Sequence, residues 1–306
     1  MRYLLLLVFG LVLSWPAHAC DLSTDARSPV LADYADNALS CLRSPEQVEF
    51  GFDASLEGLF IQRVNDERRQ EGLAPVRLRE AMRPAARFHS LDMGFNGFFG
   101  HDSPMGRDHV FRVSAFDRTL LATSSAENVA QFGPIRCRNS LDQLVSCTSA
   151  PGFKPPTAQA VVEDLHRKLM ASEGHRANIL DPQMTHIAVG VAVKETGYYV
   201  TQIFVRPVGE LSRPLPERLR AGGRLRIDAQ VPGWEIANLA LSRDASPTDL
   251  ETDILPAQLR GDYRLRPRVV QTVENGSNTG SFTTRWIYPT GPSFTAEPVR
   301  ETSPLP

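Results

Sequence analysis

Ser172-Glu173-Gly174-His175-Arg176-Ala177-Asn178-Ile179-Leu180 is the stretch that decides the fold of this 306-residue chain. A helical pattern leads into it and is predicted to end at its glycine, so that His175 lies directly beyond the helix. After a short turn at Asp181-Pro182, an alternating strand begins with Thr185-His186-Ile187-Ala188-Val189-Gly190. The stretch therefore predicts a reversal from helix to strand at which many polar groups gather.

Three segments upstream have helical periodicity. The first begins near residue 56 and is predicted to stop at Gly72, and the second has Pro84 in its first turn, where proline is tolerated. The third leads into the reversal. The apolar positions that support the three helices are Leu56, Leu59, Phe60, Ile61 and Val64, then Ala85, Ala86 and Met93, then Val161, Val162, Leu165 and Leu169.

Two strands are predicted after the reversal. In residues 187–193, bulky branched residues alternate with Ala and Gly, which leaves one face flat enough for a helix to approach closely. Residues 198–205 are apolar on both faces, and a strand of that kind is covered on both faces. An α/β fold with helices on both sides of a sheet is therefore expected.

The last third of the chain has a different pattern. Residues 207–223 contain several Pro and Arg residues and are predicted to be a linker. Beyond them the apolar alternation is almost purely that of strands, which predicts a small all-β domain at 217–300.

The first residues have the pattern of a secretory signal peptide. A basic start, the apolar run at 4–13 and Ala17-His18-Ala19 predict cleavage after residue 19. The run is shorter than the roughly 18 apolar residues of a spanning helix, so we expect no transmembrane segment in the mature chain. Export to the periplasm or to the outside of the cell follows. Cys20 would also suit a lipoprotein, but the residues before it lack the branched apolar residue of such sites. Residues 20–54 are predicted to be an N-terminal extension.

Four cysteines remain after that cleavage. An even number in an exported chain indicates disulfides, and three pairings are open. The two local pairs are favoured, Cys20 with Cys41 and Cys137 with Cys147. The second pair would close a long loop at 131–157, and no cysteine has the spacing of a zinc site.

The charge of the chain is nearly balanced. Lys and Arg number 33 and Asp and Glu 35, for a net charge of −2. This balance gives no electrostatic reason to expect a nucleic acid or an anionic membrane as partner.

Four side chains at predicted chain reversals have the chemistry of a site. His101, Glu127, Glu173 and His175 suit zinc or another divalent ion, and Glu127 and His175 also suit general acid–base catalysis. A histidine beside a turn often only bonds the backbone, and spacing alone favours that structural role. These residues do not form an H-E-x-x-H motif, in which helical geometry brings two ligands to one face.

Seven short motifs follow one another in order, and together they favour a site over a purely structural role for these residues. Together they resemble the bacterial branch of the CAP superfamily (cysteine-rich secretory protein, antigen 5 and pathogenesis-related 1), also called SCP-like extracellular proteins, over about residues 55–208. The motifs are Asn65-x-x-Arg68, His89-Ser90-x-Asp92-Met93, Phe98-Phe99-x-His101, Glu127-Asn128-Val129-Ala130, the stretch 172–180, Thr185-His186-Ile187 and Tyr199-Val200-Thr201-Gln202-x-Phe204.

The resemblance implies an α-β-α sandwich with a large open cleft. In the family, two histidines and two acidic residues line that cleft, and some members bind a divalent metal there. His101 and His175 match the two histidines and Glu127 matches the first acidic residue. Glu173 is our choice for the second acidic position, with Glu163 as the alternative.

Four further histidines and two departures from the family's motifs also bear on the resemblance. His89 and His186 match positions that we interpret as structural, with side chains that bond the backbone near the sheet, whereas His109 and His166 match none and are expected to be exposed. Ala126 stands where the family usually has Gly, which requires a negative φ there. The family's usual Trp is replaced by Leu169, which would remove an aromatic side chain from one wall of the cleft.

The resemblance implies the fold more firmly than a function. The leading hypothesis is an exported ligand-binding or effector protein whose cleft can hold a divalent metal such as zinc and a small molecule, lipid or peptide. One alternative is a metal-dependent or acid/base hydrolase of peptide or glycan, with Glu127 as base. Another is a cell-surface structural or docking module that uses the β domain. The sequence leaves open whether the protein is an enzyme.

Overall fold

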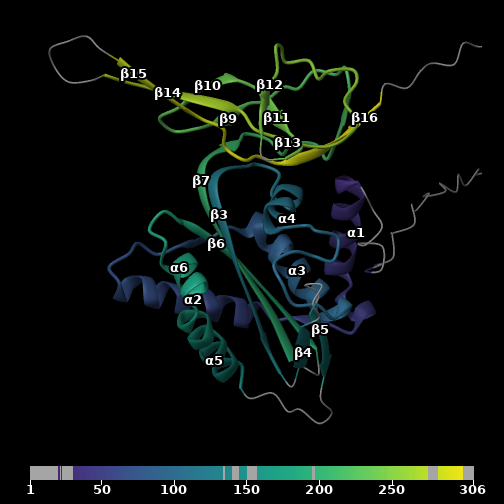
Figure 1. Ribbon diagram of the computed structural model, residues 1–306, viewed down its shortest axis with the longest axis vertical. Helices are drawn as coiled ribbons and strands as arrows, with labels where there is room; N and C mark the ends of the chain where they lie inside the picture. Colours follow the sequence, from purple (N-terminus) through teal and green to yellow (C-terminus); the bar gives the residue numbers. More distant parts are fainter. Residues whose placement is uncertain are drawn as a thin grey trace, which may run out of the picture.

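The computed structural model (Figure 1) describes residues 20, 22, 30–133, 135–139, 145–149, 157–194, 197–244, 246–274 and 282–298. The predicted signal peptide lies outside the described residues. No helix in these ranges is long and apolar enough to cross a membrane.

One mixed sheet is the centre of the first domain. Its strands run in the order β1 (Gly51–Phe52), β6 (His186–Lys194), β7 (Gly197–Leu211) and β3 (Leu120–Phe132), and β6 is antiparallel to both of its neighbours in this order. The short β2 (Arg77–Leu78) runs parallel to β6. Because β3 pairs with β7 alone in this order, it forms one edge of the sheet, and Glu127 lies on it.

Helices cover both faces of this sheet. One face is covered by α1 (Leu31–Arg43), α3 (Arg83–Asn96) and α4 (His109–Phe116), which share an apolar core with its side chains. A second core joins the other face to α2 (Ala54–Gln70), α5 (Ala158–Ala171) and α6 (Glu173–Leu180). The predicted α-β-α sandwich is confirmed (Figure 1).

The predicted flat face of β6 is the one on which α3 packs. A Cβ atom placed on Gly190 would lie 2.2 Å from the backbone nitrogen of Arg87, so only glycine allows this approach. Ser90 of the same helix donates a hydrogen bond to the carbonyl of Gly190 (2.9 Å). The bulky residues Ile187, Val189 and Val191 fill the opposite core.

Helix ends follow the sequence signals. Gly72 and Gly97 have the positive φ that ends α2 and α3, and Pro84 lies in the first turn of α3 as predicted. The expectation for residue 174 was wrong, because α5 ends at Ala171 and a new helix, α6, begins at Glu173. His175 therefore lies in the first turn of α6 and not beyond a helix.

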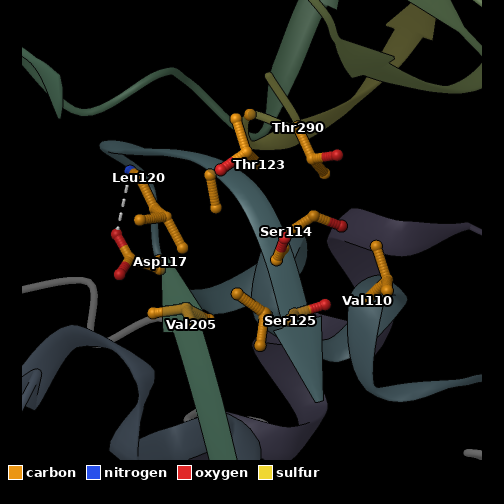
Figure 2. Close-up of a pocket in the computed structure, with 12 residues that line it drawn as sticks. Val110, Ser114, Asp117, Leu120, Thr123, Ser125, Val205 and Thr290 are labelled. Carbon is orange, nitrogen blue, oxygen red and sulfur yellow. Dashed lines mark hydrogen bonds between the residues drawn. The ribbon is translucent and has the colours of Figure 1, made fainter. Parts of the chain in front are cut away.

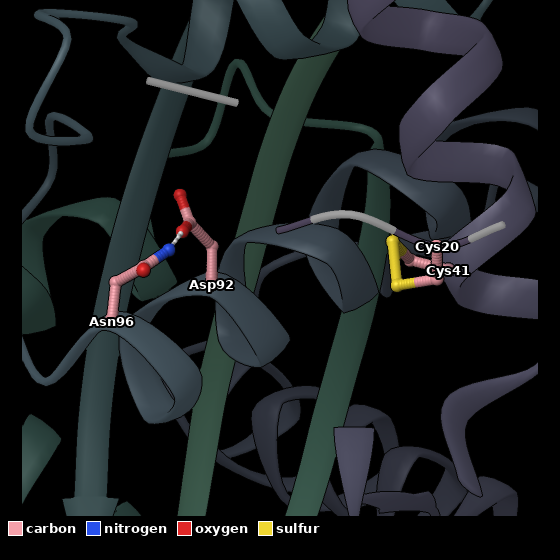
Figure 3. Close-up of a disulfide and its surroundings, with 4 residues drawn as sticks. All are labelled: Cys20, Cys41, Asp92 and Asn96. Atoms are coloured by element: carbon pink, nitrogen blue, oxygen red, sulfur yellow. Dashed lines mark hydrogen bonds between the residues drawn. A yellow bond between two sulfur atoms is a disulfide. The ribbon is translucent and has the colours of Figure 1, made fainter. Parts of the chain in front are cut away.

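The N-terminal segment is more ordered than its weak periodicity indicated. Within 20–54, α1 packs against α3, a 3-10 helix spans Pro45–Val48, and β1 joins the sheet. Figure 3 shows the confirmed disulfide that joins Cys20 to Cys41 on α1. The segment is thus part of the sandwich.

The region after β3 contains a hairpin where a long loop was predicted. Strands β4 (Ile135–Asn139) and β5 (Val145–Ser149) pair antiparallel, with Cys137 opposite Cys147 in the register. Their side chains lie outside the described part of the structure, so the second disulfide stays a prediction. In Figure 1 the hairpin lies at the end of β3 that is remote from the β domain.

The C-terminal region is all-β, as predicted, and consists of two small sheets around one apolar core. The three-stranded sheet has the order β10-β14-β15, and the five-stranded sheet has the order β12-β11-β13-β16-β8. The strands are β8 (Arg218–Arg220), β10 (Glu235–Asn238), β11 (Ala240–Ser242), β12 (Thr248–Asp249), β13 (Gly261–Leu265), β14 (Arg268–Glu274), β15 (Phe282–Ile287) and β16 (Ser293–Glu297).

Regular structure continues through the predicted linker. β7 runs to Leu211 and is paired there by β9 (Ala229–Gln230), so the sheet of the first domain extends toward the second. Arg118 donates hydrogen bonds to the carbonyls of Leu215 (2.7 Å), Pro216 (3.0 Å) and Ser293 (2.6 Å). These contacts fasten the β domain to the sandwich.

Candidate functional site

The candidate site is at the open edge of the sheet, on strand β3. Glu127 and Asn128 are consecutive, so their side chains point to opposite faces of the sheet. Glu127 bonds to groups in the α3/α4 layer, and Asn128 bonds to groups of α6. The edge strand thus joins residues from the two helical layers.

Glu127 is buried, and each of its carboxylate oxygens has a partner. Oε2 accepts a hydrogen bond from Arg112 Nη2 (2.6 Å), and Oε1 lies 3.1 Å from His101 Nδ1. Arg112, also buried, donates to the carbonyls of Arg107 (2.6 Å) and His101 (2.9 Å). One arginine therefore fixes both the carboxylate and the loop that carries His101.

The carboxylate of Glu127 is held in its charged form. Burial by itself raises its pKa, but the charge of Arg112, with smaller contributions from His89 and His101, outweighs burial and lowers the pKa to about 2. A buried carboxylate with so low a pKa is a poor general base near neutral pH, because it holds a proton too weakly. Its geometry suits an orienting role instead.

His101 is the exposed member of this group. Its side chain is 52% exposed. The hydrogen bond to Glu127 raises its pKa, an effect that burial partly opposes. With Nδ1–H donated to the carboxylate, Nε2 is the nitrogen left to bind a ligand.

His89 lies beneath this pair and has the structural role that the motif suggested. Its Nε2 lies 2.9 Å from the carbonyl oxygen of Gly100, and the ring is fully buried. Burial, followed by the charge of Arg112, lowers its pKa to about 3. His89 is therefore neutral over most of the pH range and donates to Gly100.

His175 approaches from α6, on the other side of the edge strand. Asn128 Nδ2 donates to the carbonyl of His175 (3.2 Å), and Asn178 Nδ2 donates to the carbonyl of Glu127 (3.2 Å) and to Asn128 Oδ1 (2.9 Å). These amides hold α6 on β3. The ring centroids of His101 and His175 are consequently 6.4 Å apart.

The two candidates for a second acidic residue are not brought to this pair. Glu173 is exposed at the start of α6. Glu163 is exposed on α5, where it accepts a hydrogen bond from Gln159 (3.1 Å). Within the described ranges, no three His, Cys, Asp or Glu side chains are placed to hold a metal ion.

Other side chains differ from their expected positions. His109 is half-buried with Nε2 3.0 Å from Ser125 Oγ, and His166 is buried near Glu67, so the expectation that both are exposed was wrong. His186 has Nδ1 2.9 Å from Thr185 Oγ1, a side-chain partner and not the expected backbone one.

The two departures from the family pattern are accommodated within the sandwich. Ala126 continues strand β3 without a positive φ. Leu169 is buried in the core between α5 and the sheet.

Arg112 is the residue of this site that the sequence analysis missed. It lies in the middle of the apolar run of α4, and a charge in such a position is buried only with a partner. That interruption of the apolar run was a usable signal, although the run alone does not say which acid would pair with it.

Comparisons with known proteins agree with this domain. The model of the cysteine-rich secretory protein family, CAP, matches residues 61–204. The protein YkwD of Bacillus subtilis (strain 168), itself uncharacterized, is 28% identical over 187 residues, which are 61% of this chain and 58% of YkwD. The chain thus spans little more than half the length of that relative.

Solved structures are similar to about half of the chain. An extracellular protein containing an SCP domain, from Bacillus anthracis, is 24% identical and has a TM-score of 0.36, with 50% of this chain and 40% of that chain covered. An outer surface protein of Borrelia burgdorferi is 10% identical and has a TM-score of 0.38. The similarity covers 51% of this chain and 98% of the Borrelia protein. The family match identifies residues 61–204, in the helix-and-sheet part of the chain, as a CAP domain of the cysteine-rich secretory protein family.

Proposed function

We propose that this chain is an exported binding protein that holds a divalent cation between His101 and His175, and with it a small ligand on the open edge of the sheet. The observation that supports this most is the hydrogen bond between His101 Nδ1 and Glu127 Oε1 (3.1 Å). Histidines that bind metals usually donate their second N–H to a carboxylate or carbonyl, which fixes the tautomer.

The donor set fits a site with two protein ligands. Two imidazoles that bind one zinc ion tetrahedrally have ring centroids roughly 5 to 5.5 Å apart, because zinc–nitrogen bonds are about 2.0–2.1 Å. The centroids here are 6.4 Å apart, so the two rings would have to approach each other by about 1 Å to share the ion. Both oxygens of Glu127 already have partners, so Glu127 would orient His101, and exposed Glu173 would contribute charge only.

A site with two protein ligands leaves coordination positions for the ligand that the protein binds. A carboxylate, hydroxyl or carbonyl oxygen of a small molecule, a lipid headgroup or a peptide could occupy such a position. The hydrolase alternative with Glu127 as base receives less support, because this carboxylate is buried, ion-paired and low in pKa. The predicted signal peptide supports export.

Calorimetric titration of metal-stripped protein with zinc tests the proposal. One zinc per chain is expected to bind at pH 8, and His175→Ala is expected to abolish it. His186→Ala is the matched control, because His186 lies on β6 and pairs with Thr185. Zinc binding that survives His175→Ala, or the absence of stoichiometric binding, would exclude this site.

A further inference from the structure

A second group of reactive side chains lies on the same strand, separate from the histidine pair. Ser125 precedes Glu127 by two positions on β3, and its Oγ lies 3.0 Å from Nε2 of His109, the first residue of α4. Ser125 is partly exposed. A hydroxyl and an imidazole at this distance are the elements of an activated nucleophile.

A cavity of about 70 Å³ adjoins the pair, between α4, β3 and the β domain (Figure 2). In Figure 2, Ser125, Ser114 and Val110 lie on one side of it and Thr290 of the β domain lies near Thr123. Its lining is aliphatic and hydroxyl-bearing. The residues are Val110, Val113, Ser114, Asp117, Leu120, Ala122, Thr123, Ser124, Ser125, Val205, Thr290 and Gly291.

The cavity offers no free charge. Asp117 is the one ionisable residue in its lining, and it is fully buried. Its carboxylate forms an ion pair with Arg79 and accepts hydrogen bonds from the backbone N–H groups of Thr119 (3.3 Å) and Leu120 (3.1 Å). A small uncharged group therefore fits this space better than an anion or a cation.

The β domain completes the cavity. The backbone N–H and C=O of Ala122 both bond to Thr290, at 2.9 and 2.7 Å, and place Thr290 and Gly291 over one side. On the helix side, Ser114 donates to the carbonyl of Phe111 and accepts from Ser293 of the β domain (2.8 Å). The cavity thus depends on contacts between the two domains.

We propose that Ser125 and His109 are a nucleophile and its base, which hydrolyse esters of short acyl groups such as acetyl or butyryl, and that the cavity receives the acyl chain. His109 Nε2 accepts the proton of Ser125 Oγ as the oxygen attacks the acyl carbon. The bond from that carbon to the alcohol oxygen then breaks, and the alcohol leaves with the proton from His109.

Water completes the reaction. It attacks the acyl group on Ser125 and gives one proton to His109, and the bond to Oγ breaks as Oγ takes that proton back. The products are a carboxylic acid and an alcohol, and no oxidant or metal takes part. Burial lowers the pKa of His109, which favours the neutral imidazole that a base requires.

Labelling of the nucleophile is the first test. The full mature chain is treated with a fluorophosphonate, digested and mapped by mass spectrometry, and the adduct is expected on Ser125. Ser125→Ala and His109→Gln are expected to lose the label while their thermal unfolding stays within a few degrees of the parent. Folded protein without an adduct on Ser125 would overturn the proposal, since the pair would then only hold α4 on β3.

Turnover of nitrophenyl esters is the second test. The acetate is expected to be hydrolysed at least tenfold faster than the octanoate, and Ser125→Ala should lose this activity. Thr185→Ala is the matched control, because Thr185 and His186 form another hydroxyl–imidazole pair (2.9 Å) outside the cavity. Turnover equal in Ser125→Ala and the parent, which exposed imidazoles alone would give, contradicts the proposal.

Cavity size supplies a third, independent readout. Val113→Ala enlarges the cavity and is expected to raise the butyrate-to-acetate ratio of kcat/KM at least threefold. An unchanged ratio would show that the acyl chain does not enter the cavity. The activity should persist in the presence of a chelator, so that its loss and the loss of zinc binding at His101 and His175 are separable.

Discussion

Two buried arginines of the CAP domain, each about 1% exposed, have different kinds of partner. Arg68 donates only to backbone carbonyls, those of Ala74 (2.8 Å), Ile179 (2.8 Å), Asp181 (2.9 Å) and Met184 (3.0 Å). Arg112 donates to two carbonyls and to a buried carboxylate, Glu127, which in turn holds an exposed histidine.

The difference separates a structural arginine from one that positions a site. Arg68 supplies donors to carbonyl groups in the turn between α6 and β6, which would otherwise be unpaired. Among the described residues, its contacts do not reach an exposed titratable side chain. Arg112 fixes a charge next to the surface, and through it the orientation of His101. A buried arginine thus indicates a site when its chain of contacts reaches an exposed, titratable group.

Removal of Arg68 is expected to have the largest effect on stability. Arg68→Met leaves the carbonyls at the α6–β6 turn without donors, so we expect a loss of about 5 kcal/mol in the free energy of unfolding, or no folded protein. Urea denaturation measures it. Arg69→Met on the same helix, where the arginine is exposed, should change the value by less than about 0.5 kcal/mol. A loss of less than about 1 kcal/mol for Arg68→Met would contradict this role.

Glu127→Gln is expected to cost about 3 kcal/mol, because it leaves the charge of Arg112 buried without a carboxylate. The double variant Arg112→Met/Glu127→Gln should recover part of that loss, and a cycle of the four proteins measures the coupling. Additive losses would mean that Arg112 acts through carbonyls alone, as Arg68 does, and the comparison would fail.

The sequence predicted the layers of the fold because periodicity reports burial directly. The small residues around Gly190 predicted a close helix, and α3 lies there. Periodicity did not reveal the break between α5 and α6, because no glycine or proline lies at Ser172, where the backbone is extended. Pairing between distant segments, such as β9 with the end of β7 that lies in the predicted linker, leaves no local signal.

The candidate site was predictable only in part. His101, Glu127 and His175 come together because motif order specifies which elements meet at β3. Glu173 is two residues from His175 in sequence, but residues so close together on a helix point in different directions, and Glu173 is exposed to solvent. Contacts such as that of His109 with Ser125 depend on the packing of α4, which spacing along the chain does not describe.

Acid is expected to destabilise the Arg112 region in particular. The unfolded chain protonates His89 near pH 6.5, whereas the folded chain does so only near pH 3, so the unfolded state binds more protons between these values. Stability from this group is complete above pH 6.5 and is lost as pH falls toward 3. The low pKa of Glu127, about 2, adds a loss in the same direction below about pH 4.5.

His89→Gln tests this, because an amide can still donate to Gly100 without titrating. The loss of unfolding free energy between pH 7 and pH 5 is expected to be about 2 kcal/mol smaller in the variant than in the parent. Urea titrations at several pH values measure it, with His186→Gln as control. An identical pH profile for parent and His89→Gln would show that this buried imidazole does not contribute to acid sensitivity.

The smallest expected effect is on the pH dependence of zinc binding, which Arg112 influences through Glu127 and His101. Zinc and a proton compete for His101 Nε2, and the hydrogen bond to Glu127 raises the pKa of His101, so affinity should begin to fall above pH 6.5 as pH decreases. Burial lowers the pKa of His175, and protons therefore compete with zinc for His175 only at lower pH. We expect affinity to fall roughly three- to tenfold between pH 7.5 and 6.5, about 1 kcal/mol.

Glu127→Gln should separate the two contributions of the carboxylate. At pH 8 the variant should bind zinc about 10-fold more weakly, because His101 loses its orienting acceptor. The decline with pH should also move to lower pH, because the pKa of His101 is no longer raised. Calorimetry at pH 8, 7.5, 7 and 6.5 measures both effects. If the zinc affinities of parent and variant differ by the same factor at every pH, Glu127 orients His101 without changing its pKa. The role of Arg112 would then be only structural, as that of Arg68 is.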